Sequence, residues 1–141
     1  MADILGCWRL VCAFEDRAGV IRPNPLYGEN PNGFLHYLAG GRVAVTIPLG
    51  ERRLMSSGDR RSATLHELAE SARTFDAYAG RFTLTGPDRI VHHVEVSTYQ
   101  NHVGTDLVRN IECRGEMLRL RVPPVDEGGV AIARWLDWER V

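Results

Sequence analysis

The sequence contains no lysine, and all 17 of its basic residues are arginines. This absence excludes a lysine Schiff base, a pyridoxal-phosphate lysine and the lysine of a phosphate-binding loop. The net charge is also small, with a formal value of −1 at pH 7. Without a strong field of one sign, nothing directs the chain toward nucleic acid or an anionic membrane surface. We therefore expect no nucleic acid and no membrane among its partners.

Cysteine is rare as well, with only Cys7, Cys12 and Cys113. Their number is odd and they form no Cys-x-x-Cys pair, which argues against a zinc cluster. Cys12 and Cys113 have apolar neighbours, which is typical of small core residues. We expect no signal peptide, because no basic segment followed by an apolar run opens the sequence. No stretch reaches the roughly 18 apolar residues of a membrane-spanning helix, and we predict a cytoplasmic protein with reduced thiols.

Several motifs of enzyme chemistry are missing. The sequence has no Gly-x-Gly-x-x-Gly opening a helix, no phosphate loop, no His-Glu-x-x-His and no Gly-x-Ser-x-Gly. The pair His92-His93 cannot chelate one metal ion from one strand, because adjacent side chains point to opposite faces. A metal site would need His36 or Glu95 to converge on one of them. We predict no metal site and no cofactor.

What the sequence does contain is a series of segments in which apolar and polar residues alternate. Period-two alternation is typical of half-buried strands, and Gly40-Gly41 marks a tight hairpin turn. The composition is ordinary for a globular chain, with 44% hydrophobic and 25% charged residues. We expect one domain over residues 1–141. The predicted strands are 6–15, 33–39, 42–49, 81–85, 89–99, 105–113, 116–122 and 130–140.

One segment departs from this pattern and predicts a helix over 64–79. Thr64 and Glu67 form a capping box at its start, and Gly80 suits its C-terminal cap. We interpret 16–32 and 50–62 as loops, and we expect Pro123-Pro124 to begin another. Apolar residues in the predicted helix recur at helical spacing, namely Leu65, Leu68, Ala69, Ala72 and Phe75.

The order of these elements predicts the fold class. Helices do not alternate with strands, so a parallel sheet is disfavoured. Successive hairpins favour a meander, and a meander of about eight strands can close on itself and remove its edges. Eight strands leave an interior wide enough for one small ligand. We therefore predict an all-β fold, a closed antiparallel barrel of about eight strands with one helix inserted after the third.

Several strings in this order resemble the bacterial lipocalin-like domain family. The opening Leu5-Gly6-Cys7-Trp8-Arg9-Leu10-Val11 resembles the family's first-strand motif, a variant of Gly-x-Trp. The resemblance covers nearly the whole chain and implies a closed barrel with an internal cavity, but no single activity. It also implies that Arg140 packs across Trp8 in a structural cation–π contact at the closed end. The other matching strings are Ser57–Arg60, Tyr78–Arg81, His92–Ser97, Val103–Thr105 and Leu136–Val141.

Strand parity identifies polar groups that should face the interior. In 89–99 the apolar face carries His92 inward and leaves His93 outside, and in 105–113 it carries Arg109 inward. An unpaired guanidinium in an apolar barrel is costly. Its partner is therefore Glu95 or another carboxylate reached through a bulge, or an anionic ligand. We predict His92 and Arg109 as the catalytic pair.

Further ligand-binding candidates lie on segments whose inward face is ambiguous. In 33–39 either His36 or Tyr37 can face the cavity. In 130–140 Arg134 shares a face with Leu136 and Trp138, while Trp135 lies on the other. Tyr78, on the predicted helix, reaches the ligand if the helix covers the barrel mouth. We predict His36, Tyr37, Tyr78 and Arg134 as ligand-binding residues.

Two classes of function fit a dry, shaped cavity with these groups. The first is a cofactor-independent enzyme of specialised metabolism that catalyses a cyclisation or isomerisation. Arg109 would polarise a carbonyl or stabilise negative charge, and His92 would shuttle a proton. The second is a non-catalytic carrier or sensor, in which the same groups anchor an acidic head group. The sequence favours the enzyme. We expect a small hydrophobic molecule as its partner, and a homodimer is possible.

Overall fold

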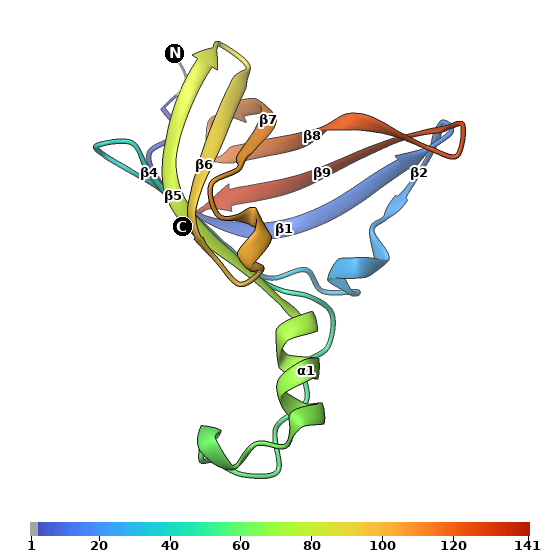
Figure 1. The fold of residues 1–141 in the computed structure, drawn as a ribbon. Helices are drawn as coiled ribbons and strands as arrows, with labels where there is room; N and C mark the ends of the chain where they lie inside the picture. The colour runs from blue at the N-terminus through green and yellow to red at the C-terminus, as the bar shows by residue number, and fades with distance from the viewer. Residues whose placement is uncertain (1–2) are drawn as a thin grey trace.

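The computed structural model describes residues 3–141, whose strands form one antiparallel sheet closed into a barrel (Figure 1). Eight strands make the barrel in the order β1-β3-β4-β5-β6-β7-β8-β9, and β9 pairs back with β1. The ninth, β2, adds to the end of β1. The predicted closed antiparallel barrel is confirmed. The strands are β1 (Gly6–Arg17), β2 (Val20–Pro23), β3 (Phe34–Leu38), β4 (Arg42–Pro48), β5 (Phe75–Gly86), β6 (Arg89–Ser97), β7 (Asp106–Arg114), β8 (Met117–Glu127) and β9 (Val130–Arg140).

The α-helix α1 (Leu65–Arg73) follows the third barrel strand, as predicted, but it is shorter than predicted. The Thr64–Glu67 capping box is present at its start. The helix ends at Arg73 with Thr74 as its C-cap, and β5 begins at Phe75. Phe-Asp-Ala-Tyr-Ala also alternates with period two, and pairing with β4 and β6 decides in favour of the strand. Three short 3-10 helices complete the elements, η1 (Pro25–Tyr27), η2 (Arg60–Ser62) and η3 (Gln100–His102).

Gly80 lies within β5 rather than at a helix end, so its predicted capping role is wrong. A bulge follows Ala79 in the pairing of β5 with β6, and it brings the two backbones together. A Cβ built on Gly80 would lie 1.9 Å from the carbonyl oxygen of His93. Only glycine permits an approach this close.

Strand β8 continues through Pro123-Pro124, where the sequence predicted a loop. Proline cannot donate a ladder hydrogen bond. The register with β9 shifts between Val122 and Val125, so the two prolines occupy the irregularity and pairing resumes beyond them. The predicted loop 16–32 likewise contains β2 and η1.

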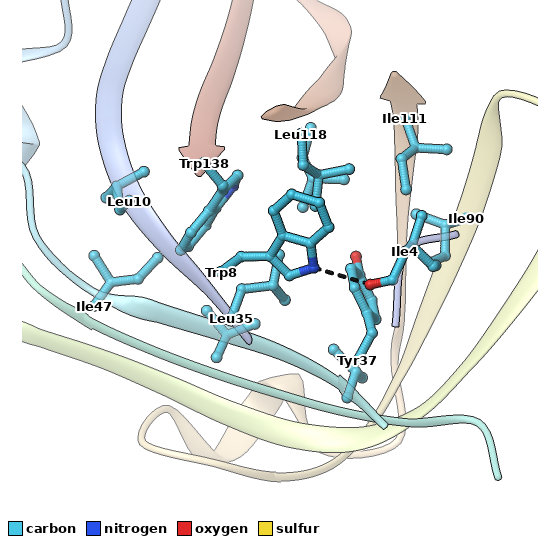
Figure 2. Packing of buried hydrophobic residues seen from close by; sticks show 13 residues of the cluster. Ile4, Trp8, Leu10, Leu35, Tyr37, Ile47, Ile90, Ile111, Leu118 and Trp138 are labelled. Atoms are coloured by element: carbon cyan, nitrogen blue, oxygen red, sulfur yellow. Dashed lines mark hydrogen bonds between the residues drawn. The ribbon is translucent and has the colours of Figure 1, made fainter. Parts of the chain in front are cut away.

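The closed end of the barrel is built around Trp8, which is fully buried (Figure 2). Its indole Nε1 donates a hydrogen bond to the Ile4 carbonyl over 2.9 Å. The Arg140 guanidinium lies 4.2 Å from the centre of the Trp8 ring, which confirms the predicted cation–π contact. Arg140 also donates to the carbonyls of Leu5 and Asp3 at 2.6 and 2.9 Å. The cation therefore ties the N-terminal segment to the last strand.

Helix α1 and the segment before it extend away from the barrel wall (Figure 1). None of the nine residues of α1 is buried. Arg52 fastens the segment to the helix by donating to the Ser71 carbonyl and the Thr74 hydroxyl, at 3.1 and 2.8 Å. In residues 3–141 no helix has the length and apolar character needed to span a membrane.

Candidate functional site

A cavity of about 350 Å³ lies toward the end of the barrel remote from the Trp8–Arg140 contact. Its volume is in the range of about 300–1,000 Å³ that is typical of small-molecule sites. The wall includes Leu26, which is 54% exposed, so the cavity reaches the surface. Its apolar part is formed by Val45, Ile47, Leu120, Val122, Leu136 and Trp138. Its polar part is formed by Glu15, Tyr27, Asp76, Tyr78, Arg109 and Arg134.

Arg109 lies in this wall, as strand parity predicted. Within residues 3–141 no carboxylate lies within 4 Å of its guanidinium, and its one hydrogen bond runs from Nη1 to the adjacent Val108 carbonyl at 2.8 Å. Glu95 is not its partner, because that carboxylate pairs with Arg42 and Arg81. A half-buried guanidinium with four further N–H donors remains available to a ligand.

Arg134 also lines the cavity, together with Leu136 and Trp138 from the same face of β9 and with Trp135 from the other face. Its charge is already compensated. Its guanidinium lies 3.5 Å from Glu15 and 3.2 Å from Glu127. Glu15 is 4% exposed and accepts two further hydrogen bonds from Arg22, which lower the pKa of that carboxyl. Of the two guanidiniums in the wall, Arg109 is the one free to bind an oxygen.

His92 faces inward, as predicted, but it lies behind the cavity wall rather than in it. It is 1% exposed. Its Nε2 lies 2.8 Å from the Tyr37 hydroxyl and its Nδ1 lies 2.8 Å from the Tyr78 hydroxyl. Burial, helped by the positive charge of Arg109, lowers the pKa of His92 to about 3. The imidazole is therefore neutral at pH 7 and holds two tyrosines in place.

Tyr78 reaches the cavity from the barrel wall and not from a lid helix. It sits on β5 between Val45 of β4 and Ser97 of β6. Burial raises the pKa of Tyr78 to about 12, although the charge of Arg109 acts in the opposite direction. Its hydroxyl is therefore protonated at neutral pH. The sequence identified the residue but assigned it to the wrong element.

The structure resolves the ambiguous face of β3. Leu35 and Tyr37 are fully buried, whereas His36 is on the outer face and stacks on Phe34. The predicted ligand role of His36 therefore has no geometric basis. Tyr37 packs edge-on against Phe82 and lies beneath the cavity wall. Tyr37 would therefore act on a ligand indirectly, through its hydrogen bond to His92 and the hydrogen bond of His92 to Tyr78.

Sequence reasoning missed Glu15, Tyr27 and Asp76 in the wall. Tyr27 and Glu15 belong to, or border, the segment interpreted as a loop, and Asp76 was placed on the helix. Burial, with the negative charge of Asp76, raises the pKa of Tyr27. Asn24, whose side chain caps η1, is the sequence signal that could have predicted a helical turn at Tyr27.

Other polar groups lie outside this cavity. His93 is on the outer surface, as predicted, and contacts Asp106 at 2.7 Å and Thr83 at 2.9 Å. Across the part of the chain that the structure describes, no group of three or more His, Cys, Asp or Glu side chains could hold a metal ion.

The barrel and its cavity are those of a small-molecule-binding β-barrel. The model of the lipocalin-like domain family matches residues 5–141, so the chain belongs to that family. A curated relative is the 4'-hydroxy-3'-methoxypropiophenone carrier protein ppsC of Aspergillus oryzae (strain ATCC 42149 / RIB 40). The two are 36% identical over 90 residues, which cover 57% of this chain and 79% of the relative. Family and relative together support binding of a small molecule inside the barrel.

Proposed function

We propose that this protein is a non-catalytic carrier of a small, mostly apolar molecule with a carbonyl or acidic oxygen at one end. The observation that carries this proposal is Arg109, a cation in the cavity wall that has no carboxylate partner among residues 3–141. The relative is named as the carrier of an aryl ketone, which combines an apolar ring with a carbonyl oxygen. A ligand of that class fits the division of this cavity into apolar and polar parts.

The protonation states beside the cavity support a carrier better than the cyclase or isomerase expected from the sequence. Acid–base catalysis works best with groups that titrate near the working pH. The pKa of His92 is about 3 and that of Tyr78 about 12, so neither group exchanges a proton readily at pH 7. His92, predicted as catalytic, is better explained as a positioning residue. In the carrier, Arg109 binds the oxygen of the ligand and the ligand is not converted to a product.

Binding of 4'-hydroxy-3'-methoxypropiophenone to the purified protein tests the proposal by titration calorimetry. We expect saturable one-to-one binding, and we expect the compound to be recovered unchanged. Arg109→Ala should weaken binding by roughly tenfold or more, because a hydrogen bond from a charged group is worth about 1.5–3 kcal/mol. Arg114→Ala is the matched control, because this arginine ends the same strand with a side chain that is 88% exposed.

Two results would count against the carrier. If Arg109→Ala binds as tightly as the parent, the guanidinium is not the anchor. Conversion of the bound ketone to another product would favour the cyclase or isomerase, in which Arg109 would polarise the same carbonyl. The cytoplasmic location and the homodimer stay predictions.

A further inference from the structure

Tyr37, His92 and Tyr78 form a chain of hydrogen bonds that runs from the core to the cavity wall. The hydroxyl of Tyr37 meets Nε2 and the hydroxyl of Tyr78 meets Nδ1, each over 2.8 Å. A neutral imidazole carries one N–H donor and one acceptor nitrogen. One tyrosine must therefore donate its proton to His92, and the other must accept the proton of His92.

The surroundings of Tyr37 decide which tyrosine donates. Tyr37 is fully buried, and among residues 3–141 its hydroxyl has no hydrogen-bond partner besides Nε2 of His92. If Tyr37 accepted from His92, its own proton would be buried without an acceptor, at a cost of about 1–3 kcal/mol. Tyr37 therefore donates to Nε2, and the proton of His92 lies on Nδ1.

This direction fixes what Tyr78 can do at the cavity. Its oxygen accepts the Nδ1 proton of His92, so among residues 3–141 its own O–H has no acceptor. Tyr78 and Arg109 line the same cavity, and a guanidinium has donors only. The cavity wall therefore includes two residues with donors to spare, the neutral Tyr78 and the charged Arg109.

Building on the proposed carrier function, we propose that Tyr78 and Arg109 form a donor-only anchor for the carbonyl or carboxylate oxygen of the ligand, with its direction set by Tyr37 through His92. Tyr37 and His92 act as positioning residues. A ligand without a carbonyl or carboxylate oxygen at this end leaves both donors unpaired, which a site of this kind discriminates against strongly. The ligand class is an aryl ketone or aryl carboxylate, not an aryl hydrocarbon.

The test compares 4'-hydroxy-3'-methoxypropiophenone with the same molecule carrying a methylene group in place of the ketone. The parent protein should prefer the ketone by at least tenfold. Tyr78→Phe should reduce that preference roughly tenfold, the equivalent of one hydrogen bond. Tyr37→Phe should reduce it about threefold, because His92 is then free to accept the Tyr78 proton. Tyr99→Phe, at a tyrosine that is 58% exposed, should leave it unchanged.

Infrared spectra of the bound ketone report the carbonyl stretching frequency, which depends on hydrogen bonding to the carbonyl rather than on packing around the ring. Hydrogen bonding lowers the carbonyl stretching frequency, and both Tyr78→Phe and Tyr37→Phe should shift the band back toward its value in an apolar solvent. Equal binding of the two compounds by the parent overturns the anchor and leaves the carrier standing. An unchanged carbonyl band in Tyr37→Phe overturns the assigned direction of the hydrogen bonds from Tyr37 through His92 to Tyr78. Failure of both compounds to bind overturns the carrier and the anchor together.

Discussion

At the scale of single residues, the cavity separates two arginines that look alike in the sequence. Arg134 lies between Glu15 and Glu127, so its donors and its charge are used within the protein. In the described part of the chain, the Arg109 guanidinium makes one hydrogen bond, to the Val108 carbonyl. Strand parity predicted that both could face inward, but parity carries no information on which carboxylates arrive from other strands. The useful difference between the two arginines is visible only in three dimensions.

The buried His92 makes stability depend on pH. Its pKa is 6.5 in the unfolded chain and about 3 in the fold, so the unfolded state binds more protons between these values. Stability is therefore fully present above pH 6.5 and is lost as the pH falls. We expect the free energy of unfolding in urea to drop by about 1.6 kcal/mol between pH 6.5 and pH 5, because the slope reaches about 1.4 kcal/mol per pH unit only below pH 6.

His92→Gln is the control for this measurement, because an amide keeps hydrogen-bonding capacity but does not titrate. We expect its unfolding free energy to lose most of this slope, whatever its absolute stability. The lowered pKa of Glu15 contributes at lower pH, since that carboxyl titrates below its usual 4.5. Parallel pH profiles for parent and variant would contradict the buried neutral imidazole.

At the scale of elements, the segment from Thr64 to Gly80 shows where sequence reasoning succeeds and where it stops. The capping box fixed the start of α1 correctly because both of its partners are local. The end depends on the pairing of β5 with β4 and β6, which are distant in the sequence. Phe75 and Tyr78 fit the apolar side of a helix and also alternate like a strand. Local periodicity cannot choose between these, and the sheet does.

Gly80 provides a test of the β5–β6 bulge. Gly80→Ala would place a methyl group 1.9 Å from the His93 carbonyl oxygen, so the strands must separate. We expect a loss of at least about 2 kcal/mol, in the upper range for overpacking, in urea unfolding followed by tryptophan fluorescence. Gly58→Ala, where an added Cβ meets no atom within 4 Å, should change stability by less than about 0.5 kcal/mol. Equal stability of the two variants would rule out the close approach of β5 and β6 at Gly80.

At the scale of the whole molecule, alternation, turn signals and the order of elements were enough to predict a closed antiparallel barrel. The predicted contact of Arg140 with Trp8 is present as well. The residues that line the cavity were harder to predict from the sequence. Its polar wall draws Glu15, Tyr27 and Asp76 from segments read as a strand end, a loop and a helix. Only closure of the sheet brings these segments around one space.

The measurement that tests the account most directly is a crystal structure of the protein with 4'-hydroxy-3'-methoxypropiophenone. We predict the aryl ring against Ile47, Leu136 and Trp138, and the ketone oxygen about 2.7–3.1 Å from both the Tyr78 hydroxyl and an Arg109 nitrogen. The contrary result is a ligand bound outside the barrel, or one seated inside with its ketone oxygen turned away from Arg109.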